Sequence, residues 1–191
     1  MAVFPLFIDL KGKKCIVVGG GKVAARKTAV LSSFDAGILV VSPEFEPEIL
    51  RLHEKGAITV CRREYQQGDL EGAFLVVAAT NDQQVNKEIA KDAGDVGAFV
   101  NVADAPELCS FIFPAVVKKD RLVIGVSTSG SCPALSRDIR KRLEKMLDGI
   151  DTDALERIGK QRKNVIEGMA DAGSRKKIID TAVSGVLKDV E

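Results

Sequence analysis

Three small residues at a fixed spacing are the first candidates for chemistry in this sequence. The segment Val17 to Ala25 reads VVGGGKVAA, and Gly19, Gly21 and Ala24 fit the pattern G-x-G-x-x-A. The first glycine allows a tight turn, the second lets the backbone approach a pyrophosphate, and the small third residue lets a helix pack closely on a strand. A helix that starts behind such a loop offers N–H groups and partial positive charge to phosphates. This spacing favours a nucleotide-binding loop over a glycine turn without a ligand.

The pattern around the loop indicates the elements that must position it. Residues 13–18 (KKCIVV) form a short β-branched run, and residues 21–33 carry apolar side chains at helical spacing, with Gly37 expected to end that helix. Further strands are expected at 38–41, 58–61, 74–79 and 98–100, and helices at 47–55 and 82–93. Strands that alternate with helices indicate a parallel, doubly wound sheet with ligands at the carboxyl ends of its strands. The glycine loop therefore has the context of a Rossmann-type nucleotide-binding domain.

The ends of the second and fourth strands bear on the cofactor. An acidic residue normally ends the second strand of such a domain and bonds the adenosine ribose. Here the strand ends in Ser-Pro-Glu, and Pro43 redirects the chain just before Glu44, so this position does not fix the choice between NAD and NADP. No arginine directly follows the strand, which favours NAD. After the fourth strand, small residues let the backbone lie close to a dinucleotide, while Asn81 or Asp82 is a candidate helix cap.

The alternation of strands and helices stops after residue 110. Residues 110–117 and 121–127 are two strand-like runs with Lys118, Lys119 and Asp120 between them, which indicates a β-hairpin. A polar turn, TSGSCP, and a helix at 134–147 follow, and residues 151–191 are charged and helical in pattern. The sequence therefore predicts a Rossmann-type parallel sheet, then a small α+β region, then a helical C-terminal region.

Charge and cysteine content exclude several classes of protein. The formal net charge is +1, with 28 Lys and Arg against 27 Asp and Glu, so no global field favours nucleic acid or a membrane surface as partner. The four cysteines are far apart with no histidine nearby, which predicts reduced thiols in a cytoplasmic protein and no metal site. The single histidine, His53, is expected on an exposed helix face. No run reaches the roughly 18 apolar residues of a membrane span, and the N-terminus lacks the basic region of a signal peptide.

Three further stretches, together with GGGKVAARK, narrow the choice among Rossmann proteins. They are FPLFIDL at 4–10, NVADAP at 101–106 with CSFIFPA at 109–115, and GVSTSGSCPALS at 125–136. In this order and spacing the chain closely resembles the siroheme-synthase dehydrogenase family, from about Phe4 to Leu147. Members of this family are precorrin-2 dehydrogenases, and some of them are also sirohydrochlorin ferrochelatases.

The resemblance implies an activity, an assembly and a cofactor site. Such enzymes oxidise precorrin-2 to sirohydrochlorin with NAD⁺ on the path to siroheme, and the bifunctional ones then insert Fe²⁺. They are homodimers. The resemblance also implies an NAD-binding domain at 1–110, a dimerisation and substrate region at 111–147 and a helical region at 148–191. The implied contacts of the dinucleotide are Gly19, Gly21, Lys22, Val23, Pro43, Glu44, Ala79, Thr80 and Asn81.

The resemblance also assigns the principal active-site residue, the aspartate of NVAD, to Asp104. Loss of a hydride from a macrocycle requires loss of a proton too, and a carboxylate within hydrogen-bonding reach is a suitable base. On residue type alone, a turn residue before Pro106 is the favoured interpretation of Asp104, and the resemblance reverses this preference. The acidic substrate needs cations and hydroxyls, for which Lys118, Arg137, Thr128 and Ser129 are the candidates, although a solvated basic face and a polar turn account for them as well.

Three alternatives to a simple dehydrogenase stay open at this point, and one of them is a chelatase-type or tetrapyrrole-binding protein that has lost its hydride chemistry. A bifunctional dehydrogenase and ferrochelatase would carry the same motifs, although the chain offers no histidine ligand near them. A non-catalytic Rossmann module that senses NAD(H) would need neither the NVAD carboxylate nor a basic substrate site.

Overall fold

The computed structural model describes residues 2–149, 152–168 and 172–187. The chain divides into two compact units, Met1–Phe113 and Pro114–Glu191, and each is described by itself. This boundary lies three residues after the end of the predicted NAD-binding domain at residue 110. The finer division of the chain into three regions stays a prediction.

The first unit is a five-stranded parallel sheet in the order β3-β2-β1-β4-β5. Its strands are β1 (Lys14–Val18), β2 (Gly37–Val41), β3 (Thr59–Cys61), β4 (Leu75–Ala78) and β5 (Phe99–Val102). Its helices are α1 (Lys22–Ser32), α2 (Pro47–Glu54) and α3 (Gln83–Asp95), with short 3-10 turns η1 (Gln67–Leu70) and η2 (Pro106–Leu108). The strand order reverses between β1 and β4, which is the point where doubly wound sheets bind ligands. The predicted Rossmann-type fold is confirmed.

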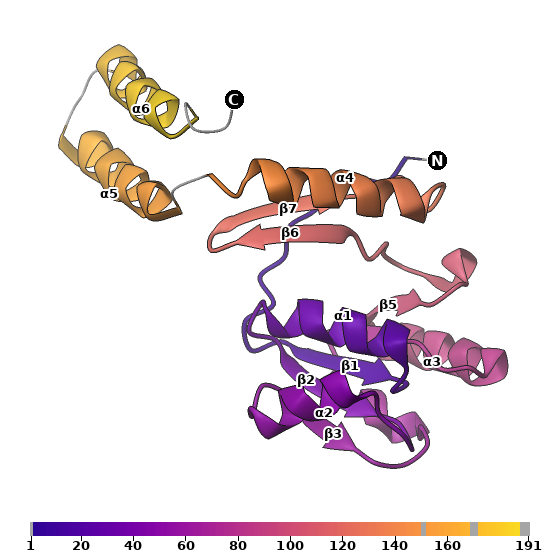
Figure 1. The fold of residues 1–191 in the computed structure, drawn as a ribbon. Coiled ribbons are helices and arrows are strands. Elements are labelled where there is room, and N and C mark those ends of the chain that lie inside the picture. Colours follow the sequence, from indigo (N-terminus) through magenta and orange to yellow (C-terminus); the bar gives the residue numbers. More distant parts are fainter. Residues whose placement is uncertain (1, 150–151, 169–171, 188–191) are drawn as a thin grey trace. The chain divides into compact units, whose positions relative to one another are not determined.

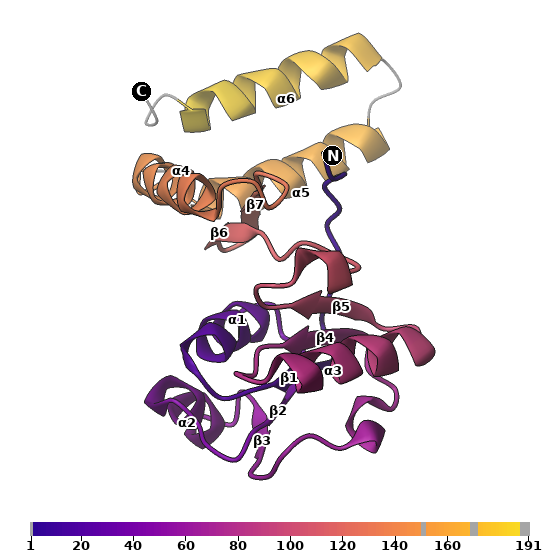
Figure 2. The same cartoon turned by 90° about the vertical axis from the view of Figure 1, so that its right-hand side faces the viewer.

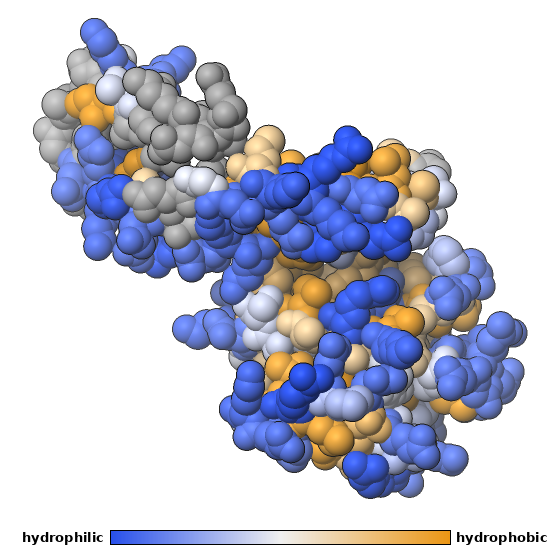
Figure 3. Space-filling view, viewed as in Figure 1, coloured by the Kyte–Doolittle hydropathy of each residue, from blue (hydrophilic) through white to orange (hydrophobic). Residues whose placement is uncertain are grey.

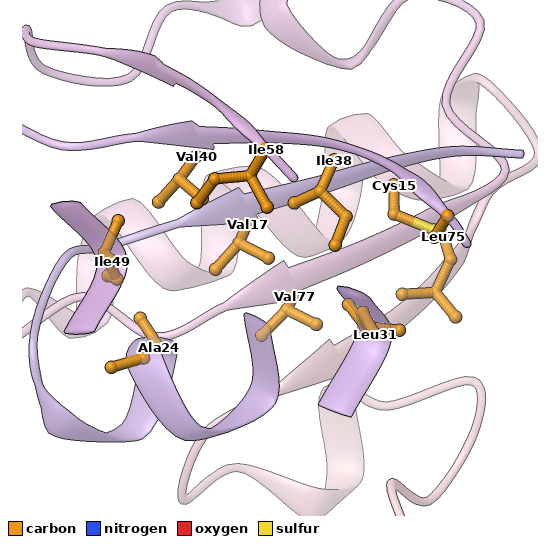
Figure 4. Close-up of a cluster of buried hydrophobic side chains, with 12 residues drawn as sticks. Cys15, Val17, Ala24, Leu31, Ile38, Val40, Ile49, Ile58, Leu75 and Val77 are labelled. Atoms are coloured by element: carbon orange, nitrogen blue, oxygen red, sulfur yellow. The ribbon is translucent and has the colours of Figure 1, made fainter. Parts of the chain in front are cut away.

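Alternation along the strands gives the sheet an apolar layer on each face. Figure 2 shows α1 and α2 on one face and α3 on the other. Cys15 and Val17 of β1 point to the face of α1 (Figure 4), and Ile16 and Val18 point to the face of α3. A strand buried on both faces reads as a continuous apolar run, which is why β1 carries Cys15, Ile16, Val17 and Val18 after the exposed Lys14.

The second unit begins with an antiparallel hairpin of β6 (Ala115–Lys119) and β7 (Leu122–Val126). The helices α4 (Pro133–Met146), α5 (Thr152–Gly168) and α6 (Ala172–Leu187) follow (Figure 1). Val117 of the hairpin and Leu147 form a small core with Leu143 of α4. Lys119 donates from Nζ to the carbonyl oxygens of Leu147 (2.6 Å) and Asp148 (3.0 Å), so this lysine caps the C-terminal end of α4.

Two details of the sequence prediction are wrong. Gly37 does not end α1, because the helix already ends at Ser32, with Ser33 as its C-cap, and Gly37 is the first residue of β2. Residues 110–114 are not part of a strand. They form a loop in which the backbone N–H of Ser110 donates to the Val100 carbonyl oxygen at 2.9 Å. The loop thereby uses hydrogen-bonding groups at the edge of β5, and its apolar side chains serve the core without forming a sheet.

Helix length and hydropathy bear on the relation to membranes. Among the helices of the described residues, none combines the length and apolar character needed to span a bilayer.

Candidate active site at the carboxyl edge of the sheet

Four strands of the sheet end level with one another. Val18 of β1 is in register with Val41 of β2 and with Ala78 of β4, and Ala78 is in register with Val102 of β5. The residue that follows each strand therefore emerges at the same edge. Hydrogen bonds extend this alignment by one residue, since the Ala79 N–H donates to the Val18 carbonyl at 2.8 Å. The structure thus brings together the predicted segments that follow β1, β2, β4 and β5.

The three glycines of the loop differ in what a side chain would meet at each position. Gly19 has a φ of +114°, and a Cβ atom there would lie 2.2 Å from the Ala79 carbonyl oxygen. A Cβ atom at Gly20 would lie 1.8 Å from the carbonyl oxygen of Glu44. A Cβ atom at Gly21 would meet nothing within 4 Å. The first two glycines let the loop pack on its neighbours, whereas Gly21 leaves open space at the start of α1.

That open space fits a dinucleotide phosphate. Gly21 is the N-cap of α1 and makes no side-chain hydrogen bond to the helix, and the first turn contains no acidic residue. The first N–H groups of a helix need acceptors from outside the helix, and an anion is favoured there by the helix dipole. Lys22 is exposed and Val23 is half-buried at this helix start. The predicted pyrophosphate site therefore has the space and the donors that it requires.

The segment after β2 lies against the glycine loop. The backbone N–H of Glu46 donates to the Gly20 carbonyl at 2.8 Å, while Pro43 and Glu44 are exposed. Arg62, the residue directly after β3, donates from Nη1 to the Pro43 carbonyl at 3.2 Å, a contact that the local sequence pattern did not reveal. Its guanidinium carbon lies 5.2 Å from the centroid of the Phe45 ring. A cation therefore stands where Rossmann domains bind the adenosine ribose, although no arginine directly follows β2.

The segment after β4 is fixed by a buried amide. Asn86 of α3 accepts from the Thr80 N–H at 3.2 Å, and its amide donates to the Thr80 carbonyl at 3.2 Å. Asp82 is the N-cap of α3, because its carboxylate accepts from the N–H groups of Gln84 and Val85 at 2.7 and 3.3 Å. Asn81 is exposed and leaves the capping role to Asp82. The backbone from Ala79 to Asn81 is thus held at the ligand edge.

Asp104 stands two residues beyond β5 in a strained conformation. Its φ is +59°, in the left-handed region that aspartate and asparagine tolerate better than most residues, and its side chain is exposed. The loop around it is closed by Cys109, whose Sγ accepts from the Val102 N–H at 3.1 Å and donates to the Ala105 carbonyl at 3.3 Å. Backbone strain of this kind is common at functional sites. The carboxylate is available to a ligand at the same edge as the glycine loop.

A lysine and an asparagine that the sequence analysis did not assign lie beside this loop. Lys27 of α1 donates from Nζ to Oδ1 of Asn101 on β5 at 2.6 Å, and it stands 4.3 Å from the centroid of the Phe113 ring. The Asn101 amide donates in turn to the Phe111 carbonyl at 3.1 Å. Burial lowers the pKa of Lys27 to about 8, and the positive charge of Arg26 acts in the same direction. The sequence offered one signal for this lysine, namely a charged residue on the apolar side of the helix that became α1.

The predicted substrate residues all belong to the second unit. Thr128 lies in the turn before α4, where its hydroxyl accepts from the Cys132 N–H at 3.0 Å and bonds the Ser136 hydroxyl at 3.2 Å. Ser129 occupies the same turn with a φ of +53°. Arg137 on α4 has its Nε 3.5 Å from the Asp138 carboxylate, and Lys118 is exposed on β6. The visible side of α4 is largely hydrophilic in Figure 3. The hydroxyl of Thr128 thus stabilises the turn in which Ser129 lies.

No cluster of metal-binding residues is found in the described part of the chain, where the search covers groups of three or more His, Cys, Asp and Glu. His53 is exposed on α2 as predicted, and its Nδ1 lies 3.1 Å from the Ile58 carbonyl. The imidazole therefore belongs to the packing of α2 on the strand that follows.

A parallel sheet with an open glycine loop at its switch point defines an NAD(P)-binding Rossmann protein. Residues 6–115 match the NAD_binding_7 family of NAD(P)-binding domains, so the chain carries a domain for a nicotinamide cofactor. The structure is also similar to that of SirC, a precorrin-2 dehydrogenase, with a TM-score of 0.75 and 30% sequence identity over 94% of this chain and 88% of that one. The chain belongs to the siroheme-synthase dehydrogenase family, as its motifs predicted.

Two longer relatives support the same assignment. The chain is 45% identical over 144 residues to the siroheme synthase of Pseudomonas aeruginosa (strain LESB58), which covers 75% of the chain and 31% of that protein. It is 36% identical over 190 residues to the siroheme synthase of Chromobacterium violaceum, which covers 99% of the chain and 40% of that protein. The chain therefore spans less than half the length of these curated relatives.

Proposed function

We propose that this protein is a precorrin-2 dehydrogenase, which oxidises precorrin-2 to sirohydrochlorin with NAD⁺ in siroheme biosynthesis. The observation that carries the proposal is the exposed carboxylate of Asp104, held in a left-handed conformation at the edge of the sheet that also carries the open glycine loop. The similarity to SirC extends over 94% of the chain, and it supports the same reaction for both units together.

The reaction removes a hydride and a proton from the macrocycle. NAD⁺ supplies the hydride acceptor when it is bound. We assign its pyrophosphate to the N–H groups at the start of α1, behind Gly21, and its adenosine end to the segment of Pro43 and Glu44. Ala79, Thr80 and Asn81 would line the path between the ends of β1 and β4. The proton goes to the carboxylate of Asp104, which is exposed and has no role in capping a helix.

NAD⁺ is the proposed cofactor, with NADP⁺ as the comparison. Glu44 adds negative charge after β2, which disfavours the 2′-phosphate of NADP⁺, whereas Arg62 adds positive charge beside Pro43. We expect NAD⁺ to bind at least about tenfold more tightly. Titration calorimetry with each dinucleotide measures the ratio, and tighter binding of NADP⁺ would assign the dominant charge to Arg62 instead of Glu44.

The acidic substrate would be bound by groups of the second unit. Lys118 and Arg137 supply positive charge, and Thr128 and Ser129 supply hydroxyl and backbone donors in the turn before α4. We also propose that the protein works as a homodimer, since the core between the hairpin and α4 has only two buried residues among those that the structure describes, Val117 and Leu147. All four cysteines are free, which supports a cytoplasmic location for a protein with reduced thiols.

Replacement of Asp104 by asparagine tests the proposal. Asparagine tolerates the same positive φ and keeps the size of the side chain but cannot accept the proton, so turnover should fall by about 10²–10⁴-fold while NAD⁺ affinity stays unchanged. The assay is anaerobic precorrin-2 with NAD⁺, followed through NADH absorbance and the spectrum of sirohydrochlorin. Asp35→Asn is the matched control, because Asp35 also has a positive φ of 55° and is exposed in the same unit.

Three outcomes separate the alternatives. Near-normal turnover of Asp104→Asn would reduce Asp104 to a turn residue. Wild-type protein that binds NAD⁺ but never forms NADH from precorrin-2 would instead favour a sensor of NAD(H). Addition of Fe²⁺ to the sirohydrochlorin product tests the bifunctional alternative, since a chelatase accelerates formation of siroheme above the rate without protein.

A further inference from the structure

Lys27 lies where an apolar side chain would be expected. It belongs to α1, which also carries the buried residues Ala24, Thr28 and Leu31, and its side chain is half-buried. A leucine or methionine at this position would cover the Phe113 ring without the cost of removing a charge from water. Partial burial of the ammonium group costs free energy, so the contacts of Lys27 should indicate what the charge does.

The contacts of Lys27 are specific. Its Nζ donates to Asn101 Oδ1 at 2.6 Å, a charge-assisted hydrogen bond, and it faces the Phe113 ring at 4.3 Å from the centroid. Asn101 is itself buried, with 7% of its surface exposed, and uses its amide to hold the Phe111 carbonyl at 3.1 Å. One lysine therefore fixes both the strand before Asp104 and the loop after it.

The charges around Lys27 come from two elements. Arg26 of α1 lowers the pKa of Lys27 together with burial, while Cys109 and Asp104, both from the segment after β5, act to raise it. Lys27 therefore attracts the Asp104 carboxylate, and this interaction is weaker than the effects of burial and of Arg26. At neutral pH Lys27 is charged, and it loses its charge as the pH rises through about 8.

We infer that Lys27 is a positioning residue of the dehydrogenase site, which holds the Asn101–Phe113 segment through two contacts and supplies a positive charge that attracts the carboxylate of Asp104. This inference rests on the proposed function. The proton acceptor of the reaction must stay anionic while an acidic macrocycle docks beside it, and nearby positive charge offsets that repulsion. Lys27 acts through Asp104 and Asn101, and it exchanges no proton with the substrate.

A pH profile distinguishes this role from a merely structural one. For wild-type protein at saturating NAD⁺, kcat/KM for precorrin-2 should decline as the pH rises through about 8, since Lys27 then becomes neutral. Lys27→Met keeps the apolar stem but removes the charge. It should lower kcat/KM at pH 7 by about 10–100-fold, the range for loss of a charged hydrogen bond, and it should abolish the decline near pH 8. NAD⁺ affinity should change by less than about twofold, because Lys27 lies in the middle of α1, away from the helix start to which we assign the phosphate.

Two further variants move the profile in a defined direction. Lys27→Arg keeps the positive charge well beyond pH 10, so it should restore part of the rate and move the decline to higher pH. Arg26→Met removes a charge that lowers the pKa of Lys27, so it should also move the decline upward, by less. Lys87→Met, which removes an exposed lysine from α3, is the matched control and should reproduce the wild-type profile.

The outcomes that overturn the inference are separate from those that overturn the function. If the wild-type protein oxidises precorrin-2 and Lys27→Met retains both its rate and the decline near pH 8, Lys27 has no part in the reaction. If folded Lys27→Met loses activity but Lys27→Arg leaves the profile where it was, the role is packing alone. Wild-type protein without NADH formation contradicts the proposed function and removes the basis of this inference with it. An NMR titration of the lysine side chains, with Lys27 assigned from its absence in Lys27→Met, measures the pKa without any substrate.

Discussion

Gly21→Asp separates the stability of this protein from its affinity for a dinucleotide. Gly21 has a φ of −79° and a ψ of −174°, an extended conformation open to any residue, and a Cβ atom there meets nothing within 4 Å. Aspartate is among the preferred N-cap residues, and its charge suits the N-terminus of a helix. The substitution therefore adds to α1 a cap that the helix lacks, while it places a carboxylate in the space that we assign to the pyrophosphate.

The substitution should raise the stability of the protein slightly and lower its affinity for the dinucleotide strongly. An N-cap in place of glycine contributes a few tenths of a kcal/mol, and the dipole interaction adds about 0.3–1 kcal/mol. For a chain of this size that raises the melting temperature by about 1–4 °C. Repulsion between the carboxylate and one phosphate charge at about 4 Å costs about 4 kcal/mol at an effective dielectric constant near 20, a loss of about a thousandfold in affinity.

Thermal unfolding and titration calorimetry measure both numbers on one preparation. We expect Gly21→Asp to melt slightly above the wild-type protein without ligand and to show no further rise with NAD⁺. Gly21→Ala is the control, since it adds the Cβ atom without the charge and should lose far less affinity. Unchanged NAD⁺ binding by a folded Gly21→Asp protein would refute the assignment of the phosphate site to the start of α1.

Three further outcomes follow from the packing and the proposed assembly. Gly20→Ala should cost about 1–3 kcal/mol in chemical denaturation, since its Cβ atom would lie 1.8 Å from the Glu44 carbonyl oxygen and must push the β2 loop away; a neutral effect would mean that the loop docks differently. Thr28→Val should raise the free energy of unfolding by about 1 kcal/mol, because the buried Thr28 hydroxyl makes no hydrogen bond; destabilisation would point to a partner for that hydroxyl. Light scattering at micromolar concentration should give twice the chain mass of 20.5 kDa, and a mass near 20.5 kDa would contradict the proposed dimer.

Local patterns were sufficient for the Rossmann sheet. Each of its strands is a short apolar run and each of its helices has apolar residues at helical spacing, so periodicity alone located them within a few residues. Gly56 follows the C-cap of α2 with a φ of +70°, the left-handed conformation common for a glycine after a helix. Gly37 misled the prediction, since a glycine after a helix marks its end in some chains and opens the next strand in this one. The left-handed residue after α1 is Asp35 instead, with a φ of 55°.

Contacts between distant residues lay beyond the reach of the sequence. Lys27 and Asn101 are 74 residues apart, and nothing in either local pattern says that they meet across the sheet. Arg62 reaches the end of β2 from beyond β3, so a rule that inspects only the residues directly after β2 overlooked it. The family motif located Asp104, because an aspartate shortly before a proline is on its own typical of a turn. What the sequence lacked was the register between strands, which decides which strand ends share an edge.

The position of α1 has a mechanical consequence. The helix starts at the phosphate site and reaches Lys27 six residues after Gly21, a rise of about 9 Å along a stiff rod. Its buried stripe of Ala24, Ala25, Thr28 and Leu31 sets the seating of that rod on the sheet. Any change that slides or tilts α1 therefore displaces the phosphate site and Lys27 together. Mutations that disturb the packing of this stripe are therefore expected to impair cofactor affinity and turnover in parallel, whereas damage to the packing of α3 leaves the two uncoupled.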